Sequence, residues 1–256
     1  MRLTLSIRKT LEDNASQYFE QAKKSKRKLE GARLAMQRVA AAKPVKQRAV
    51  RRKKEWYEQY RWTMSADGTL VIGGKDATSN EALIKKRTET IDTVLHTDLA
   101  GSPFVIIKGA ASEGALEAGA MLAACYSKAW KQGLSTVEVF WVKPEQVSKT
   151  PNTGEYVGKG SFIIRGEKHY LKPELRLCLG LVDNTPIVAT AALFKAKGAG
   201  FVELRPGKET TIAVAKKLAK RLGATVDEWA RLLPAGGCVI TSTTHKNTVE
   251  DKITHG

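Results

Sequence analysis

His96 and Asp98 have metal-binding chemistry and stand close together, as His-x-Asp, at the end of an apolar stretch. Imidazole and carboxylate groups both bind zinc, but a zinc site takes three or four protein ligands held together. His169 is a further candidate ligand, and it is distant in the chain. We therefore interpret His96 as a structural histidine and keep a metal-dependent enzyme as an alternative hypothesis.

Two glycine-rich stretches resemble phosphate-binding loops only in part. In residues 154–161 the spacing is one residue short of a P-loop, and Gly160 stands where a serine or threonine would bind magnesium. Residues 71–76 are likewise too short for a dinucleotide-binding fingerprint. Ser148 and Lys149 are adjacent, so on a strand or loop their side chains point apart and do not form a nucleophile–base pair. We predict no catalytic residues, no metal site and no cofactor.

Another chemistry available to this chain is the binding of a polyanion by cations on a rigid element. The sequence predicts a β-hairpin with strands at residues 155–157 and 161–165, joined by a glycine-flanked turn. Lys159 would stand at the tip, Arg165 near the base, and Lys149 in the loop before the hairpin. Cations placed in this way suit contact with phosphates. The alternative is an ordinary hairpin whose lysine keeps an edge strand from aggregating.

The N-terminal sequence predicts a basic helical arm over residues 1–61. Thr10 and Asp13 form a capping pair at the start of a helix. Pro44 ends this helix, and a second helix from about Val45 to Arg61 would fold back to complete a helical hairpin. Small or apolar residues recur at the 3.5-residue period of a coiled-coil seam, namely Leu11, Ala15, Tyr18, Ala22, Ser25, Leu29, Ala32, Met36 and Val39.

From residue 62 the pattern changes to short strands and helices, which predicts a globular domain over residues 62–242 and a polar flexible tail over 243–256. Turn residues at 66–68 and 183–184 predict β-hairpins. An alanine-rich helix, apolar over most of its surface, is expected at residues 113–132. Further helices are expected near residues 79–87, 210–222 and 226–233. The predicted class is α/β (mixed α+β), with a basic helical hairpin or coiled-coil arm before a single mixed-sheet domain.

The charge of the chain indicates its type of partner. The 256 residues carry a formal net charge of +17, and the first 61 hold 18 lysines and arginines against 6 acidic residues. A charge of this size favours a nucleic acid or an anionic membrane. No apolar run reaches the roughly 20 residues of a membrane span, and the first residues lack the apolar region of a signal peptide. We therefore expect no membrane and a cytoplasmic location.

The cysteines indicate a reducing compartment. Cys125, Cys178 and Cys238 stand far apart in apolar runs, and no Cys-x-x-Cys pair is present. This spacing does not fit a structural zinc site, and an odd number does not fit a secreted disulfide framework. We predict that all three are reduced and lie in the core.

Several blocks of the sequence resemble one known family. The run VSKTPNTGEYVGKGSFIIRGEKHYL, from Val147, is similar to the signature of the NFACT-R domain, the RNA-binding module of NFACT proteins. That family includes the elongation factors of ribosome quality control. Blocks that begin at Thr10 (TLEDNASQYFEQ), Lys54 (KEWYEQYRWTMS) and Val94 (VLHTDLAGSPFVIIKG) resemble further family segments in the family's order. The resemblance covers nearly the whole chain as far as about Ile240.

The resemblance implies an RNA-binding protein of ribosome-associated quality control that binds transfer RNA or ribosomal RNA at the large ribosomal subunit. Cations would contact phosphates, and aromatic rings would stack on unpaired bases. The candidate RNA-binding residues are Lys75, Lys108, Lys149, Lys159, Arg165, Lys168 and Tyr156, with Phe162 and Tyr170 as weaker stacking candidates. Relatives usually carry Asp-Leu-His-Gly where this chain has Ala100 in place of the histidine, so any role of that ring in RNA binding is lost here.

The resemblance also implies that the chain begins after the NFACT-N domain and helix-hairpin-helix segment of full-length relatives. The arm is shorter than in those relatives, which favours a native short form over a fragment, with a separate NFACT-N-like protein as a further partner. Two hypotheses from other classes stay open. One is a metal-dependent nucleic-acid-processing enzyme that uses His96 and Asp98. The other is a basic adaptor whose arm docks on an acidic protein.

Overall fold

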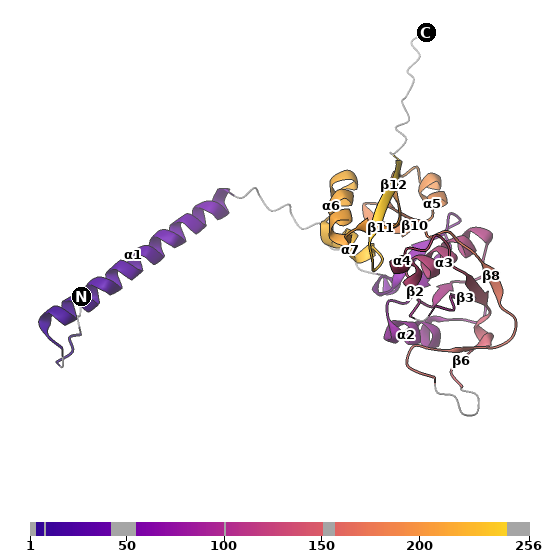
Figure 1. The fold of residues 1–256 in the computed structure, drawn as a ribbon, viewed down its shortest axis with the longest axis horizontal. Coiled ribbons are helices and arrows are strands. Elements are labelled where there is room, and N and C mark those ends of the chain that lie inside the picture. Colours follow the sequence, from indigo (N-terminus) through magenta and orange to yellow (C-terminus); the bar gives the residue numbers. More distant parts are fainter. Residues whose placement is uncertain (1–3, 8, 42–54, 100, 151–156, 245–256) are drawn as a thin grey trace, which may run out of the picture. The chain divides into compact units, whose positions relative to one another are not determined.

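The structure is a computed structural model that describes residues 4–7, 9–41, 55–99, 101–150 and 157–244. The chain divides into two compact units, residues 1–54 and 55–256, which are described separately below (Figure 1).

The first unit contains the long helix α1 (Leu11–Ala41). The hydroxyl oxygen of Thr10 accepts a hydrogen bond from the Asp13 N–H at 3.1 Å, so the predicted cap is confirmed. The Asn14 amide also donates to the Thr10 carbonyl at 2.9 Å and ties the preceding loop to the helix. The return helix predicted from Val45 to Arg61 falls largely outside the described residues. Its described end differs from the prediction, because Trp56–Gln59 form a 3₁₀ helix and a strand begins at Arg61.

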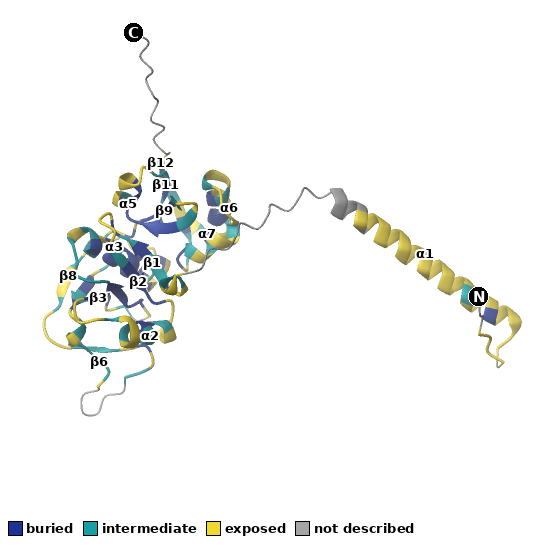
Figure 2. Cartoon of the chain, turned by 180° about the vertical axis from the view of Figure 1, so that it is seen from behind, coloured by how far each residue is buried: buried dark blue, intermediate teal, exposed yellow. Residues whose placement is uncertain are grey.

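Apolar side chains of α1 have no covering element in the described part of the arm. Among the predicted seam residues, Leu11, Leu29 and Met36 expose 64–76% of their surface, and Phe19 exposes 82%. Figure 2 shows exposed residues along most of this helix. Because helices of this kind gain most of their stability from packing an apolar face, α1 presents a surface suited to a partner helix.

The second unit opens with a 3₁₀ helix, η1 (Trp56–Gln59), followed by a six-stranded sheet in which all neighbouring strands are antiparallel. Its strands, in spatial order, are β1 (Arg61–Met64), β2 (Leu70–Gly73), β4 (Val105–Ile107), β3 (Thr93–His96), β5 (Val139–Val142) and β8 (His169–Leu171). The predicted β1–β2 hairpin is confirmed, and Gly68 at its turn has a φ of 88°.

A four-stranded antiparallel sheet follows. Its strands, in spatial order, are β10 (Thr185–Ala189), β9 (Leu177–Val182), β11 (Phe201–Glu209) and β12 (Cys238–Thr244). Asp183 and Asn184 join β9 to β10 with φ of 49° and 59°, the geometry of the turn predicted there. The helices beside it are α5 (Ala191–Ala196), α6 (Thr211–Leu222) and α7 (Val226–Leu232). The mixed α+β class, with a helix before a sheet-containing domain, is thus confirmed.

The expected helix at residues 113–132 is two helices, α3 (Glu113–Cys125) and α4 (Lys128–Gln132). Ser127 causes the break, because its hydroxyl accepts a hydrogen bond from the Ala129 N–H at 3.1 Å and begins a new helix. α3 is buried around most of its circumference, as predicted. A Cβ on Gly119 would lie 3.0 Å from Leu95, so this glycine lets α3 approach β3 closely.

The core of the second unit joins both sheets. Val71 and Leu95 of the first sheet belong to the same buried cluster as Leu179 and Val202 of the second, with α3 among them. On the opposite face of the six-stranded sheet, Ile72 and Ile106 pack against Leu83 of α2 (Ala77–Arg87). The three cysteines are buried and free, as predicted. In the described ranges, no helix has both the length and the apolar character needed to cross a bilayer.

Candidate nucleic-acid interface

In the predicted signature hairpin, β7 (Ile163–Ile164) pairs with β6 (Val147–Ser148), which follows the 3₁₀ helix η2 (Pro144–Gln146). The strand predicted at residues 155–157 falls largely outside the described residues. Residues 151–156 lie outside the described part, so the predicted stacking residue Tyr156 is not placed. Lys159 and Arg165 of this hairpin are exposed, and Lys149 is half-buried. The hairpin lies against the domain, because Phe162 and Ile164 pack on the buried residues Phe104 and Phe140 of the six-stranded sheet and its flanking loop.

The glycine turn of the hairpin docks on helix α2. Gly160 has a φ of 75°, and a Cβ there would lie 2.5 Å from the Ala77 Cα. Its N–H donates to Glu81 Oε2 at 3.1 Å. The hydrogen bond from Lys85, followed by the one from Gly160, lowers the pKa of Glu81 to about 2. The turn is therefore held by a close backbone contact and by an ionised carboxylate.

Lys149 fastens the hairpin from inside. Its Nζ donates to the carbonyl of Gly158 at 2.8 Å and to that of Ser161 at 3.0 Å. It also lies 3.6 Å from Glu81 and 4.9 Å from the centre of the Phe162 ring. Because the Lys149 ammonium group already has these partners, it stabilises the turn and is less available to bind a ligand.

Lys108 is paired with two acidic side chains. Its Nζ lies 2.6 Å from Asp92 Oδ2 and 3.1 Å from Glu89 Oε1, and it donates to the Arg87 carbonyl at 3.0 Å. The Asp92 side chain is fully buried, so removing Lys108 would leave a buried carboxylate without its cation. This geometry gives Lys108 a structural role.

Arg165 and Lys168 have fewer partners among the described residues than Lys108 and Lys149 have. Arg165 donates through Nη2 to the Thr150 carbonyl at 3.2 Å, and among the described residues its other guanidinium N–H groups have no hydrogen-bond partner. Lys168 lies 3.0 Å from Asp98 and 4.2 Å from the centre of the Phe140 ring. Tyr170, on β8, exposes 54% of its surface. These residues lie at the outer side of the hairpin and at the sheet edge.

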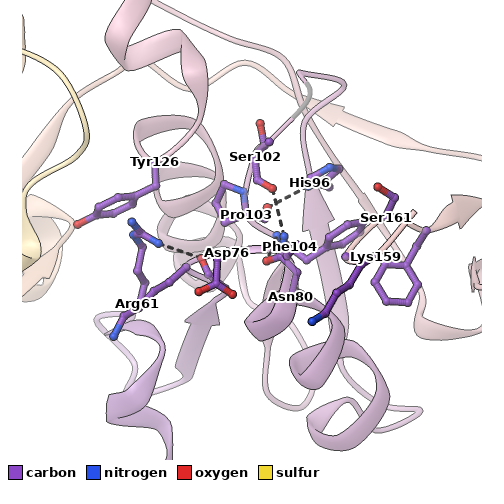
Figure 3. A pocket seen from close by; sticks show the side chains of 16 residues that line it. Arg61, Asp76, Asn80, His96, Ser102, Pro103, Phe104, Tyr126, Lys159 and Ser161 are labelled. Atoms are coloured by element: carbon purple, nitrogen blue, oxygen red, sulfur yellow. Dashed lines mark hydrogen bonds between the residues drawn. The ribbon is translucent and has the colours of Figure 1, made fainter. Parts of the chain in front are cut away.

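Lys75 and Lys159 come together at a cavity of about 260 Å³ between three connections, namely the β2–α2 loop, the β3–β4 loop and the hairpin turn (Figure 3). Lys75 Nζ donates to the Gln59 carbonyl at 2.7 Å. Lys159 is exposed, and its side chain has no hydrogen bond or ion pair with the part of the chain that the structure describes. The cavity is therefore where predicted cations and a concave surface coincide.

Arg61 also lines the cavity, and it is not among the binding residues predicted from the sequence. Its Nη1 donates to the Gly74 carbonyl at 3.1 Å, and its guanidinium lies 4.5 Å from the centre of the Tyr126 ring. Its Nε is buried and has no hydrogen-bond partner among the described residues. Burial lowers the pKa of Arg61, which stays cationic because guanidinium does not lose its proton in proteins. Arg61 shares its strand face with the fully buried Thr63, and this burial is visible only in the structure.

Asp76 is the acidic residue that lines the cavity, and it serves the helix. Its carboxylate accepts hydrogen bonds from the Ser79 N–H at 2.8 Å and hydroxyl at 3.0 Å. These bonds, the N–H first, lower the pKa of Asp76. Asp76 thus caps α2, which begins two residues earlier than predicted.

His96 and Asp98 have partners that explain both residues without a metal. The His96 ring stacks on Phe104 at 3.9 Å between ring centres, and its Nδ1 lies 2.9 Å from the Pro103 carbonyl. Burial lowers the pKa of His96 and favours the neutral ring. Within the described ranges, no three histidine, cysteine or acidic residues form a group that could hold a metal ion.

Comparisons with known proteins show which proteins this chain resembles. Residues 59–166 match the family described as NFACT protein RNA binding domain. The archaeal Rqc2 homologue aRqcH of Methanocaldococcus jannaschii is 39% identical over 202 residues, which are 75% of this chain and 30% of that protein. The ribosome quality control complex subunit NEMF of Homo sapiens is 37% identical over 179 residues, 62% of this chain and 16% of the human protein.

The NEMF homologue of Drosophila melanogaster is 42% identical over 135 residues, 51% of this chain and 13% of the fly protein. The chain therefore spans less than a third of the length of each relative named here. The family resemblance seen in the sequence is confirmed: residues 59–166 match the NFACT protein RNA binding domain, and the similar proteins include an Rqc2 homologue and the ribosome quality control subunit NEMF.

Proposed function

We propose that this chain binds transfer RNA or ribosomal RNA at the large ribosomal subunit, as a non-catalytic cytoplasmic component of ribosome-associated quality control. The observation that supports the RNA contact best is the cavity, because it brings Lys75, Lys159 and Arg61 together within the residues matched to an RNA-binding family. Similarity to an archaeal Rqc2 homologue and to the ribosome quality control complex subunit NEMF supports the process.

Under this proposal, some of the cations contact RNA phosphates and the others stabilise the surface that carries them. Lys159 and Arg165 are exposed and would contact phosphates, with Lys168 beside them and Lys75 at the cavity. Lys108 and Lys149 hold the surface in place through carboxylates and carbonyl groups. Phosphate contacts position a protein on RNA without reading its sequence, so we expect little base specificity from this set.

The experiment that tests this function is purification of the full chain without nuclease, followed by sequencing of the RNA that co-purifies. We expect an absorbance ratio at 260 and 280 nm typical of a protein–RNA complex and reads enriched in transfer or ribosomal RNA. Affinity for that RNA should fall steeply with salt, because each phosphate contact releases condensed counterions. Purification free of nucleic acid, with no affinity for either RNA class at low salt, would contradict the proposal.

The adaptor hypothesis has one observation in its favour, the exposed apolar side chains of α1, which include Leu11, Phe19 and Leu29 (Figure 2). A helix that presents both cations and apolar residues can bind a partner helix as well as RNA. Comparing the RNA affinity of residues 53–256 with that of the full chain separates the two roles. We expect weaker binding by the shortened chain; equal affinity would assign the arm to a protein partner.

A further inference from the structure

We propose that the cavity between the β2–α2 loop, the β3–β4 loop and the hairpin turn is a subsite for one phosphate group of an RNA strand, held between the guanidinium of Arg61 and the ammonium of Lys159. The inference rests on the proposed RNA binding and adds which residues make the contact. Figure 3 shows Arg61 and Lys159 on opposite sides of the cavity, with Asp76 and Asn80 between them.

Arg61 is held in place before any ligand binds. One of its five N–H groups reaches the Gly74 carbonyl, and the plane of the guanidinium lies over Tyr126. Tyr126 is fixed in turn, because its hydroxyl donates to the Leu232 carbonyl. A cation fixed in this way loses little conformational entropy when it binds, which is what makes a preorganised site efficient.

The hydrogen-bonding capacity of Arg61 is incompletely used. Its Nε is buried without a partner, and none of the described carboxylates lies within 4 Å of the guanidinium. Buried guanidinium groups are almost always paired with an anion, since an unpaired buried charge is strongly unfavourable. An arginine fork matches the oxygens of a phosphate group, so a phosphate oxygen is the partner that this geometry lacks.

The net charge of the cavity selects an anion. Arg61, Lys75 and Lys159 line it against the single carboxylate of Asp76. That carboxylate accepts hydrogen bonds from Ser79, where it caps α2, and its one negative charge offsets only part of the charge of Arg61 and Lys159. Because Asp76 and Ser79 satisfy the first turn of α2, we do not assign the phosphate to the end of this helix. The remaining attraction comes from side-chain cations.

The size of the cavity indicates how much of the RNA enters. A volume of about 260 Å³ lies just below the range of ligand pockets, which starts at about 300 Å³. This space suits a phosphate with part of its sugar and is too small for a whole nucleotide. Asn80 bridges the Phe104 N–H and the Ser102 carbonyl and fixes the wall without reading a base. The subsite is therefore predicted to be indifferent to sequence.

The test compares single variants of the full chain in binding to a short single-stranded RNA at several salt concentrations. Lys159→Ala should weaken binding by about threefold to tenfold and lower the log–log salt slope by about 0.7, the value for one phosphate on a single strand. Arg61→Lys keeps the charge but loses the fork, and should weaken binding by a similar factor. The matched control is Lys208→Ala, an exposed lysine on β11 of the other sheet, which should bind as the wild type does.

Each outcome separates the subsite from the wider function. Wild-type affinity and slope in both Lys159→Ala and Arg61→Lys would overturn the subsite and leave RNA binding standing. An equal loss in Lys208→Ala would show diffuse attraction, which also overturns it. Absence of RNA binding by the wild type would overturn the proposed function first. Because Arg61 also supports the fold, the exposed Lys159 decides the result if Arg61→Lys fails to fold.

Discussion

The six-stranded and four-stranded sheets both carry lysines and arginines, but they hold them differently. Beside the four-stranded sheet, α6 presents Lys216 and Lys220 in exposed positions. Beside the six-stranded sheet, Arg61 and Lys159 line a cavity, and one guanidinium nitrogen is buried without a partner. The net charge of the two regions does not show which of them would bind an anion specifically. The cations at the cavity are partly desolvated and held in a fixed geometry, and these two properties make their contact with an anion specific.

The largest expected effect is the loss of stability when a glycine of either region is replaced by alanine. A Cβ at Gly160 would lie 2.5 Å from Ala77 at a positive φ, and a Cβ at Gly180 would lie 2.5 Å from the Phe194 ring. We expect Gly160→Ala and Gly180→Ala each to lower the free energy of unfolding by about 2–4 kcal/mol. Chemical denaturation followed by circular dichroism measures this loss.

The two variants should differ in RNA affinity. Gly160→Ala displaces the wall that carries Lys159, so its folded fraction should bind RNA more weakly. Gly180→Ala disturbs the four-stranded sheet, and its folded fraction should bind as the wild type does. If both variants bind equally, whether weakened or not, the assignment of the RNA contact to the six-stranded sheet is wrong.

The next effect comes from two lysines of the same hairpin. Lys149 bonds to two carbonyls and is partly buried, whereas Lys159 is exposed without such bonds in the described residues. We expect Lys149→Ala to lower the free energy of unfolding by about 1–2 kcal/mol, the value for hydrogen bonds to a charged group with an allowance for its exposure. Lys159→Ala should change it by less than about 0.5 kcal/mol.

Thermal denaturation of the two variants, beside their RNA affinities, checks this division of roles. Lys149→Ala would lose stability first and affinity as a consequence, while Lys159→Ala would lose affinity alone. The reverse pattern would mean that the hairpin turn is held by other contacts and that Lys149 is the ligand contact.

Local chemistry explains what could be predicted from the sequence. Gly68 and the pair Asp183–Asn184 located two turns, because positive φ is a property of the residue itself. The cap at Thr10 was predictable for the same reason, since its partner is three residues away. The buried cysteines followed from the apolar runs around them. In each case the signal and its cause lie within a few residues.

The site depended on contacts between distant segments, which no local pattern contains. Arg61 becomes a site residue only because Tyr126 and the hairpin turn meet it in space. The hairpin pairs at Val147–Ser148 because Phe162 finds its apolar partners on the sheet. The sequence predicts the same RNA-binding role for Lys159 and Lys108. Only the ion pair with the buried Asp92 shows that Lys108 stabilises the fold.

A smaller effect on RNA affinity is expected when the exposed lysines of α6 are replaced. We expect the double variant Lys216→Ala, Lys220→Ala to bind RNA within about twofold of the wild type at 150 mM salt, because exposed charges are screened beyond about 8 Å. Its log–log salt slope should match that of the wild type. A slope lowered by about 1.4, the value for two lost phosphate contacts, would place α6 in the interface and remove the contrast between the two regions.

The smallest effect is a pH dependence at the junction of the hairpin and α2. The folded-state pKa of Glu81 is lowered from 4.5 to about 2 by hydrogen bonds from Lys85 and Gly160. A lowered pKa means that the ionised carboxylate stabilises the fold, so its contribution is complete above about pH 4.5 and disappears as the pH falls toward 2. Glu81→Gln should therefore show a flatter loss of stability between pH 4.5 and 2 than the wild type.

Glu228, which caps α7 beside the four-stranded sheet, is the matched control. Hydrogen bonds from the hydroxyl and N–H of Thr225 lower its pKa, so Glu228→Gln should flatten the same acid limb. The two variants should separate in hydrogen exchange. Below pH 4.5 only the loss of Glu81 should speed exchange of the Gly160 N–H, because that amide donates to Glu81. Equal exchange at Gly160 in both variants would show that the turn is held by its backbone contact with Ala77 and not by the carboxylate.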